Sequence, residues 1–478
     1  MKSIKNFFCS IGRFFKDFGV AVVKGDIWVK LSLLIMGAGY FGRKQYVKGV
    51  IMTAVQAAFI AFTILFGLPY IGKFDTLGDV QRESVYDPAL RKNVVNDYDH
   101  SFKILLFGLI SIIVVIVAVV IWIRNVVSVR KLQVLAENGK HINTFREDVR
   151  EFRNGKFHIT LLSLPVAGIV CFTIVPLIVI ILVAFTSYNK THMPPAELFT
   201  WVGFDNFEKM FSSSLTTTFN YSFGKVLSWT LIWAVTATAT TYIGGILLSM
   251  FLNNSKTKLP KMWRTFFVIA IAVPQFVSLL LVRNFFADMG IVNTICSNLG
   301  ITDFLKEIGL VRSSLDHIPF LTDPTWAKFT IIIINIWVGV PYLMLIATGV
   351  LMNIPTDLTE AARIDGANGF QIFRKITMPY MLFVTGPYLV TQFVGNINNF
   401  NVIYLLTNDV YITLDQKLAN STSAETDLLV TWLFKLTQND YNYNMASVIG
   451  IMVFIICAVF TLVAFNFMIK GDREEDFQ

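Results

Sequence analysis

Several side-chain amides lie in otherwise apolar stretches of the sequence, and an amide can both donate and accept hydrogen bonds. Asn335, Gly339 and Tyr342 are spaced at i, i+4 and i+7, which places them on one face of a helix. Asn396 and Asn399 are three residues apart and share a face if that segment is helical. Amides of this kind match hydroxyl groups, and an aromatic ring offers a flat apolar face to a pyranose. The residues therefore predict sugar binding, with hydrogen bonding between helices as the alternative.

Other kinds of site chemistry have little support in the sequence. The four cysteines lie far apart, at positions 9, 171, 296 and 457, and no CxxC pair occurs. This pattern supports neither a disulfide framework nor a zinc site, and we expect no cofactor. A membrane-embedded enzyme would need catalytic acids gathered at one membrane face, but Asp87, Asp97 and Asp99 form no recognisable motif.

A helix–turn–helix is predicted at 354–377, which reads IPTDLTEAARIDGANGFQIFRKIT. Asp357 and Glu360 resemble a helix-capping pair. Gly366 marks a turn, because glycine reaches backbone angles that other residues avoid. A projection of this shape suits docking in a groove on another protein. The apolar side chains of its second helix, about one turn apart, are Phe370, Phe373 and Ile376.

These residues belong to a chain of 478 residues that is 54% hydrophobic and only 15% charged. Soluble globular proteins carry roughly 25% charged residues, and about 20 apolar residues cross a bilayer as a helix. We therefore predict an all-α integral membrane protein with eight transmembrane helices. The predicted spans are 47–69, 104–123, 159–185, 226–252, 266–286, 328–352, 377–395 and 445–469.

The distribution of charge predicts the orientation of these spans. With the N-terminus inside, the cytoplasmic segments hold about twice as many Lys and Arg residues as the outer segments. We therefore predict a multi-pass protein of the bacterial plasma membrane with both termini in the cytoplasm. The net charge of +8 is explained by this topology, so it indicates no nucleic-acid partner.

Three regions are expected along the chain. Residues 1–46 form a cytoplasmic or interfacial segment, 47–158 hold two peripheral spans with an acidic outer loop, and 159–478 hold a six-helix core. In the first region, apolar residues at helical spacing suit either a helix on the membrane surface or a helix packed on the protein. Those residues are Phe7, Ile11, Phe14 and Phe18.

Two further features describe the interior of the spans. No Asp or Glu lies in any span, which counts against a proton- or sodium-coupled carrier. Prolines are expected to interrupt the spans, and such breaks are tolerated where they line a cavity or pack on protein. These prolines are Pro165, Pro176, Pro274, Pro341, Pro379 and Pro387.

The segment 354–377 resembles the EAA loop of ATP-binding-cassette (ABC) importer permeases, in which E-A-A-x-x-D-G-A precedes a hydrophobic–proline pair. The resemblance implies the type I ABC importer permease fold and a loop that sits in a cleft of an ATPase subunit. No G-x-x-x-x-G-K-[ST] phosphate loop occurs in the chain. We therefore expect a separate ATPase and no enzymatic activity in this chain. The implied coupling residues are Glu360, Ala361, Ala362, Asp365, Gly366, Ala367, Phe370 and Phe373. The motif continues with Ile376, Met378 (where the family usually has Leu) and Pro379.

Roughly residues 160–470 resemble the larger membrane subunit of maltose and maltodextrin importers. The resemblance is carried by IIIINIWVGVPYLMLIATGVL, by QFVGNINNFNVIYLLTND and by TDLLV at 426–430. It implies a second permease subunit, two ATPase subunits, an extracellular sugar-binding protein and an oligosaccharide substrate. The outer loop 186–225 lacks the folded domain of the best-known Gram-negative relatives. It resembles Gram-positive relatives, whose binding protein is lipid-anchored.

The same resemblance implies a set of sugar contacts. An aromatic contact position of the family falls on Ile271 here and another on Gly395, which predicts a wider or less adhesive pocket. Trp337 is assigned to packing. Two alternatives stay open, an ABC permease for another sugar and an ATP-independent carrier or channel. The implied contacts are Asn335, Val338, Gly339, Tyr342, Gly395, Asn396, Asn399 and Gln275.

Overall fold

The computed structural model describes residues 2–88, 91–212, 218–254, 257–408, 410 and 413–470. The chain divides into two compact units, Met1–Gly203 and Phe204–Gln478. The functional division predicted at residue 159 stays a prediction.

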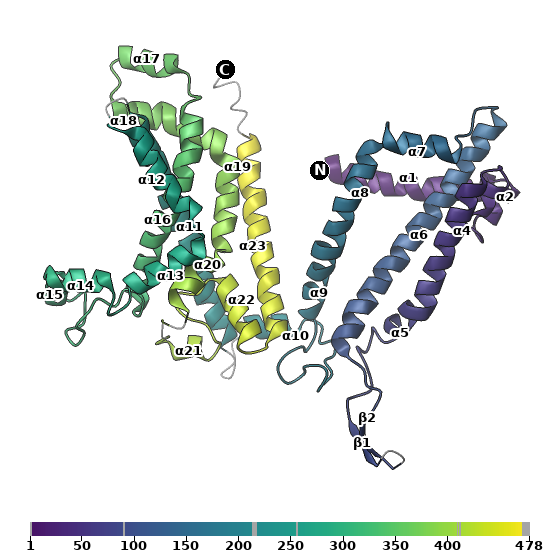
Figure 1. Cartoon of the computed structure of the whole chain (residues 1–478), viewed down its shortest axis with the longest axis horizontal. Coiled ribbons are helices and arrows are strands. Elements are labelled where there is room, and N and C mark those ends of the chain that lie inside the picture. Colours follow the sequence, from purple (N-terminus) through teal and green to yellow (C-terminus); the bar gives the residue numbers. More distant parts are fainter. Residues whose placement is uncertain are drawn as a thin grey trace. The chain divides into compact units, whose positions relative to one another are not determined.

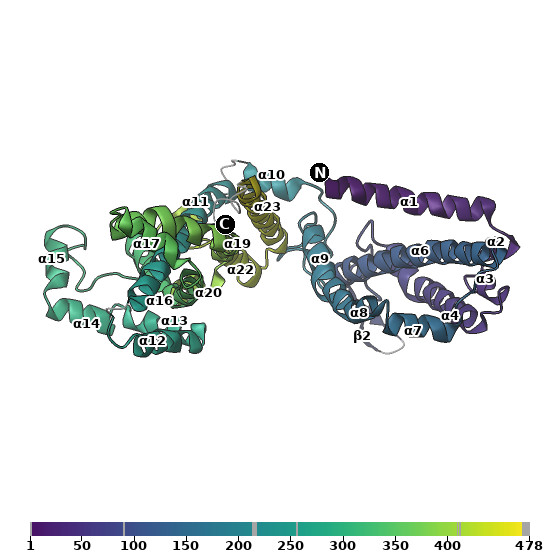
Figure 2. The same ribbon diagram turned by 90° about the horizontal axis from the view of Figure 1, so that it is seen from above.

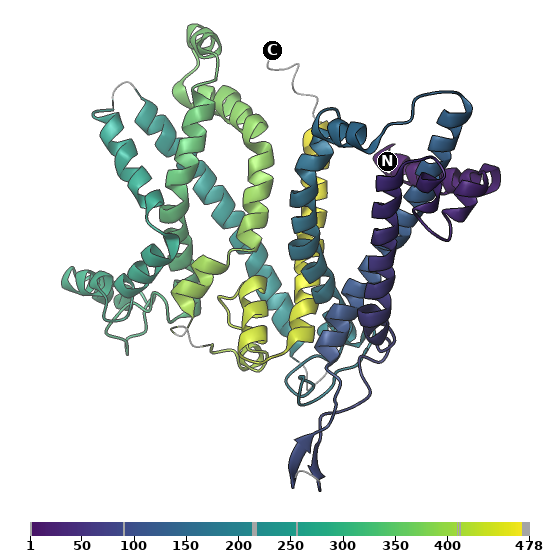
Figure 3. The same cartoon turned by 45° about the vertical axis from the view of Figure 1, so that its right-hand side comes forward.

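The first unit consists of helices and one short β-hairpin (Figures 1 and 3). Strand β1 pairs antiparallel with β2, with Ser84 opposite Val95. The prediction of an all-α chain is wrong for this hairpin, which lies between α5 and α6 in the loop that is predicted to be outside. The elements are α1 (Lys2–Lys24), α2 (Ile27–Leu31), α3 (Ala38–Phe41), α4 (Tyr46–Phe62), η1 (Thr63–Gly67), α5 (Leu68–Ile71), β1 (Ser84–Asp87), β2 (Lys92–Val95), α6 (Ser101–Glu137), α7 (Phe145–Arg153), α8 (Phe157–Ile169), η2 (Val170–Ile174) and α9 (Val175–Val183).

The second unit is helical in its described residues. Its long helices run between two ends, with α17 and α18 at one end and α10 and α21 at the other (Figure 1). The elements are α10 (Asp205–Phe211), α11 (Phe219–Asn253), α12 (Pro260–Ala272), α13 (Gln275–Phe285), α14 (Ile291–Asn298), α15 (Ile301–Glu307), α16 (Pro324–Leu351), α17 (Thr356–Ile364), α18 (Gly369–Ile372), η3 (Phe373–Thr377), α19 (Met378–Ile397), α20 (Phe400–Thr407), α21 (Gln416–Ala419), α22 (Leu429–Gln438) and α23 (Tyr443–Lys470).

Six helices in the described part of the chain are long and apolar enough to cross a membrane. They correspond to six of the eight predicted spans. The fifth predicted span is divided into α12 and α13, and the seventh is α19, whose apolar sequence is diluted by prolines and amides. The six helices are Tyr46–Ile71, Ser101–Glu137, Phe157–Val183, Phe219–Asn253, Pro324–Leu351 and Tyr443–Phe467.

Proline ends a helix at fewer positions than predicted. Pro274 separates α12 from α13. By contrast, Pro165, Pro341 and Pro387 lie inside the continuous helices α8, α16 and α19. The expected interruption is therefore wrong for these three prolines, because the neighbouring turns keep the chain helical.

The π-helical turns η1, η2 and η3 share one sequence feature, a proline two residues after the turn ends. These prolines are Pro69, Pro176 and Pro379. Proline has no N–H group, and its ring crowds the carbonyl four residues earlier. In all three cases that carbonyl lies inside the π turn, where the wider ring of hydrogen bonds gives it room.

The core of the second unit depends on a close crossing of α11 and α16. A Cβ atom on Gly245 would lie 2.5 Å from the Leu343 Cβ and 3.0 Å from the Leu343 carbonyl carbon. A Cβ on Gly339 would lie 2.7 Å from the Thr241 Cγ2. Small residues allow helix backbones to approach closely in membrane proteins. The two glycines therefore set how near these helices can pack.

The first unit has its own core, in which α1 packs against α6. Ala21 and Val126 are fully buried there, and the rings of Phe18 and Trp122 lie 5.3 Å apart. The predicted packing on the protein is thus confirmed for the second half of α1. The Phe7 and Ile11 side chains lie outside what the structure describes. Helix α1 runs crosswise to α4 (Figures 1 and 2).

The glycine crossing generates a prediction about stability. We expect Gly245→Ala to lower the free energy of unfolding by about 1–3 kcal/mol, because the added methyl group meets backbone atoms that cannot move away. Gly224→Ala on the same helix is the control, since nothing lies within 4 Å of its Cβ. Unfolding of the purified chain in an SDS titration measures both. Equal stability of the two variants would contradict the close crossing.

Candidate functional site

The predicted sugar-binding face of α16 is only partly buried. Asn335 is 6% exposed, whereas Tyr342 is 51% exposed and its ring lies 6.5 Å from that of Tyr388 on α19. Gly339 lies between them along the helix and faces Thr241 of α11. The face therefore runs from a buried amide to an accessible aromatic ring. Gly339 has a packing role at this face in addition to the contact implied for it.

Asn396 of α19 is buried and joined to α11. Its Nδ2 donates to the Thr238 Oγ1 (2.9 Å), and the Trp233 Nε1 donates to the Asn396 carbonyl oxygen (3.1 Å). An unpaired amide is costly in an apolar environment. Hydrogen bonding between helices, the alternative to sugar binding, is therefore present at Asn396.

Asn399 lies beyond the end of α19 and caps the next helix. Helix α19 ends at Ile397, and the Asn399 side chain accepts a hydrogen bond from the Val402 N–H (3.3 Å) at the start of α20. Asn396 and Asn399 consequently do not share one helix face, because that would require one continuous helix through both residues. The break occurs where four asparagines in six residues compete with the backbone for hydrogen bonds.

Gln275 lies at the start of α13 and contacts the same asparagine-rich segment. The Asn401 Nδ2 donates to the Gln275 Oε1 (3.3 Å), and both side chains are exposed. This contact joins α13 to α20, although Gln275 and Asn401 are far apart in the sequence. The family resemblance predicts Gln275 as a sugar contact, but the sequence does not indicate that Asn401 is its hydrogen-bond partner.

The remaining predicted contacts differ in their surroundings. Val338 packs against the cluster that contains Trp233 and Ile334. Gly395 is exposed, and no atom lies within 4 Å of a Cβ built on it. Trp337, which is predicted to pack, is half exposed. Together, α13, α16, α19 and α20 carry the predicted contact residues, and these helices contact one another or α11.

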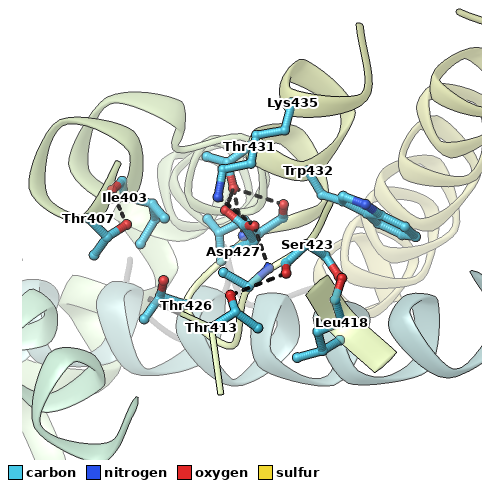
Figure 4. A network of polar contacts seen from close by, with 12 residues as sticks. Ile403, Thr407, Thr413, Leu418, Ser423, Thr426, Asp427, Thr431, Trp432 and Lys435 are labelled. Atoms are coloured by element: carbon cyan, nitrogen blue, oxygen red, sulfur yellow. Dashed lines mark hydrogen bonds and ion pairs between the residues drawn. The ribbon is translucent and has the colours of Figure 1, made fainter. Parts of the chain in front are cut away.

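A buried ion pair lies beside this group of helices (Figure 4). Asp427 is 1% exposed and accepts hydrogen bonds from the Lys435 Nζ (2.9 Å), the Ala424 N–H (2.7 Å) and the Thr431 hydroxyl (2.9 Å). Each carboxylate oxygen is thus engaged, which offsets the cost of burying the charge. The pattern TDLLV does not by itself predict this ion pair; the available signal is Lys435, eight residues after the aspartate.

The ion pair lies in a turn-containing segment before α22 that is hydrogen-bonded to α11. The Trp229 Nε1 donates to the Thr426 carbonyl oxygen (3.1 Å), and the Leu429 N–H donates to the Thr230 hydroxyl (3.1 Å). Trp229 and Leu428 are members of one buried cluster together with residues of α13, α16 and α20. The segment therefore packs against helices that carry the candidate contact residues.

The helix–turn–helix predicted at 354–377 is present, as α17 and α18. The predicted capping pair is wrong, because α17 begins at Thr356 after Pro355 and no side chain caps it. Glu360 lies in the second turn, and its side chain is exposed. At the turn, Gly366 adopts a φ of +81°, a conformation that glycine reaches without strain. Glu360 therefore does not cap α17, which is the structural role that the sequence suggested for it.

The second half of the loop is capped and anchored. The Asn368 side chain accepts from the Gln371 N–H (2.9 Å), and the Gln371 side chain accepts from the Asn368 N–H (2.8 Å). Phe373 packs on the core cluster of Tyr242 and Met381. The loop is therefore joined to the helix bundle at its second end.

Both helices of the loop present an apolar side chain to the surroundings, Ile364 from α17 and Phe370 from α18. Ile364 is 87% exposed and Phe370 is 69% exposed. The other predicted coupling residues are either exposed, namely Glu360, Ala361, Asp365 and Gly366, or half-buried, namely Ala362, Ala367 and Phe373. Exposed apolar side chains on a projecting loop are typical of a docking surface.

A bundle of membrane-length helices around buried amides, with a projecting helical loop, defines the chain as a multi-pass membrane permease. It belongs to the family described as the binding-protein-dependent transport system inner membrane component, whose model matches residues 242–469. The chain is 32% identical over 439 residues to the maltodextrin transport system permease protein MdxF of Bacillus subtilis, which covers 91% of this chain and 94% of that protein.

Other relatives match over similar lengths. The chain is 31% identical to the maltodextrin transport system permease protein MalC of Streptococcus pneumoniae, over 93% of this chain and 96% of that protein. It is 30% identical to the galactooligosaccharides transport system permease protein GanP of Bacillus subtilis, over 93% and 98%. A crystal structure of a bacterial ABC transporter that imports alginate shares the fold, with a TM-score of 0.50 at 22% identity over 68% of this chain and 98% of that chain.

The buried ion pair generates a second prediction about stability. We expect Lys435→Met to lower the free energy of unfolding by about 3–5 kcal/mol, because it leaves Asp427 as a buried charge without its cation. The double variant Asp427→Asn/Lys435→Met removes both charges and is expected to recover much of the loss. An SDS titration of the purified chains measures both. A single variant as stable as the native chain would show that the pair contributes nothing.

Proposed function

We propose that this chain is the larger membrane subunit of an ATP-driven importer for maltodextrin-type oligosaccharides. Two relatives with nearly the same length are named for maltodextrin transport. The helices that carry Asn335, Tyr342, Asn396 and Gln275 supply amides and an aromatic ring, the groups that bind hydroxyls and pyranose faces. The partners are a second permease subunit, two ATPase subunits and an extracellular, lipid-anchored sugar-binding protein.

The proposed topology has eight spans with both termini in the cytoplasm. The pair α12–α13 and helix α19 add two crossings to the six long apolar helices. Helix α23 ends at the same end of its unit as α17 and α18 (Figure 1), which supports a cytoplasmic C-terminus beside the coupling loop. The excess of Lys and Arg in the inner segments supports the same orientation.

The observation that carries the proposal is the coupling loop, exposed at one end and anchored at the other. Ile364 and Phe370 are free to enter a cleft of an ATPase subunit, whereas Phe373 packs in the core. Closure of the ATPase dimer on ATP would move the loop as a lever. Through Phe373 that movement reaches α11 and α19, the helices around the sugar face.

The transport cycle then follows from this lever. A loaded binding protein docks outside, ATP closes the ATPase pair, and the cavity opens outward to accept the sugar. Hydrolysis of ATP resets the cavity inward. Sugar affinity in the membrane is expected to be weak, since transport requires release as well as capture.

Reconstitution tests the function and its substrate together. The chain is co-expressed with the neighbouring-operon products, and the complex is assayed in lipid for ATPase activity with binding protein and maltotriose. Stimulation by maltotriose, and none by a galactooligosaccharide, is expected. Stimulation only by the galactooligosaccharide would keep the importer and reject the sugar. Sugar flux through the chain alone without ATP would favour a carrier or channel and reject the importer.

Glu360→Lys tests the coupling loop. We expect this variant to abolish sugar uptake while the permease still reaches the membrane, because the charge reversal lies on the docking face of α17. Glu307→Lys reverses an exposed charge on α15, far from the loop, and serves as the control. Uptake of labelled maltotriose by cells is the measurement. Normal uptake with Glu360→Lys would remove the basis for the proposed lever.

Tyr342→Ala tests the sugar face. Aromatic contacts contribute about 0.5–1.5 kcal/mol, so the KM for maltotriose is expected to rise about two- to tenfold with little change in complex assembly. Trp337→Ala removes another half-exposed ring of the same helix and is expected to leave the KM unchanged. Equal effects of the two substitutions on KM would contradict a sugar contact at Tyr342.

A further inference from the structure

A cavity of about 480 Å³ in the first unit is lined by four cationic side chains and by no carboxylate. It lies where the loop before α4 meets the start of α7. The cations are Arg43, Lys44, Lys48 and Arg146, and the apolar lining includes Val47 and Phe145. No part of the coupling loop or of the sugar face contributes to it.

Two of the four cations are held in place by partners outside the cavity. The Arg43 guanidinium donates to the Asp26 Oδ2 (2.9 Å) and to the Gly39 carbonyl oxygen (2.8 Å). Lys48 forms an ion pair with Asp148 and donates to the Asn143 carbonyl oxygen (2.9 Å). Arg43 and Lys48 therefore form part of the cavity wall, and their charges are already paired with Asp26 and Asp148.

The other two cations are uncompensated. Within the part of the chain that the structure describes, neither Lys44 nor Arg146 forms an ion pair with a carboxylate. Lys44 also adopts a φ of +59°, which is unusual for a residue with a side chain and places a strained backbone at the cavity. Two cations directed to one cavity without a counter-charge favour an anionic ligand.

Among the carboxylates of helix α7, Glu147 is held by the residues just before the helix, in a capping box with Thr144. The Thr144 N–H and hydroxyl and the His141 ring all contact the Glu147 carboxylate. Hydrogen bonds from the Thr144 N–H, from His141 and from the Thr144 hydroxyl lower the pKa of Glu147 to about 2. The Gln45 Nε2 donates to the Asn143 carbonyl oxygen (2.8 Å), which ties the start of α7 to α4.

The surroundings of the cavity indicate what kind of anion it would hold. Helix α4 begins at Tyr46 and continues as a membrane-length apolar helix. Val47, Val50 and Ile51 are exposed along its first two turns. A second cavity of about 620 Å³ shares Lys48 and Phe145 with the first, and its mixed lining includes Ile51, Asp148 and Glu151. The cationic cavity thus lies beside exposed apolar side chains at the start of a membrane-length helix.

We propose that this cavity binds the phosphate of an anionic phospholipid, with an acyl chain along Val47, Val50 and Ile51. Basic pockets at the ends of membrane helices bind acidic headgroups, and each Lys or Arg near the surface contributes to the attraction. Lys44 and Arg146 bind the phosphate, while Arg43 and Lys48 shape the pocket. The acyl chain explains the apolar side of the site, which a free phosphate ion would not use.

Native mass spectrometry of the purified full chain tests the site. The chain is titrated with phosphatidylglycerol and, separately, with phosphatidylcholine. Preferential retention of phosphatidylglycerol is expected, with about thirtyfold weaker binding to Lys44→Gln/Arg146→Gln. The control variant Arg91→Gln/Lys92→Gln loses two cations at the β-hairpin, at the other end of the unit, and is expected to bind as the native chain does.

Three results would overturn the proposal. The first is equal binding of phosphatidylcholine, and the second is full binding by the Lys44→Gln/Arg146→Gln variant. The third is displacement of the lipid by millimolar inorganic phosphate, which would make the cavity a site for free anions. Lys44→Gln alone provides a second variant if the double substitution does not fold. Because no partner or sugar is present, failure here leaves the proposed transport function untouched.

Discussion

The close crossing of α11 and α16 is the constraint on which the second unit depends. Both helices carry a glycine at the point where the partner's atoms would collide with a side chain. Once the backbones are this near, α11 can hydrogen-bond α19 through Thr238 and Trp233. Farther along, it can hold the segment that contains Asp427. The positions of the candidate contact residues follow from that one helix.

The amides in this bundle have structural roles that are compatible with the proposed sugar binding. The Asn396 side chain donates a hydrogen bond to Thr238, and the Asn399 side chain accepts one from the Val402 N–H at the start of α20. Each side chain still has hydrogen-bonding capacity beyond the bond that it makes. An amide of this kind is held in place without ligand, so the proposed sugar site would need no rearrangement of Asn396 to form. The structural and the binding interpretations are therefore compatible at the same residue.

Local patterns were sufficient for some features and insufficient for others. The long apolar runs predicted α6, α11, α16 and α23, and the glycine-containing loop motif predicted the α17–α18 turn, because both depend on neighbouring residues. The end of α19 at Ile397 and the contact of Gln275 with Asn401 depend on tertiary packing. The buried ion pair of Asp427 could not be predicted, because a charged residue type does not indicate that its side chain is buried. The β-hairpin was missed because its strands have only four residues each.

The π turn η3 sets the rotation of α19 relative to α18. Because a π turn holds more residues per turn than an α turn, α19 is out of phase with α18 by the rotation that the extra residue introduces, about 100°. Phe373 is directed to the core at the start of this turn, and Pro379 follows its end. Deleting one residue between them would restore α-helical phase and rotate the docking face about the axis of α19. The number of residues between the loop and its proline therefore determines the rotational orientation of α18 relative to α19, independently of which motif residues the loop contains.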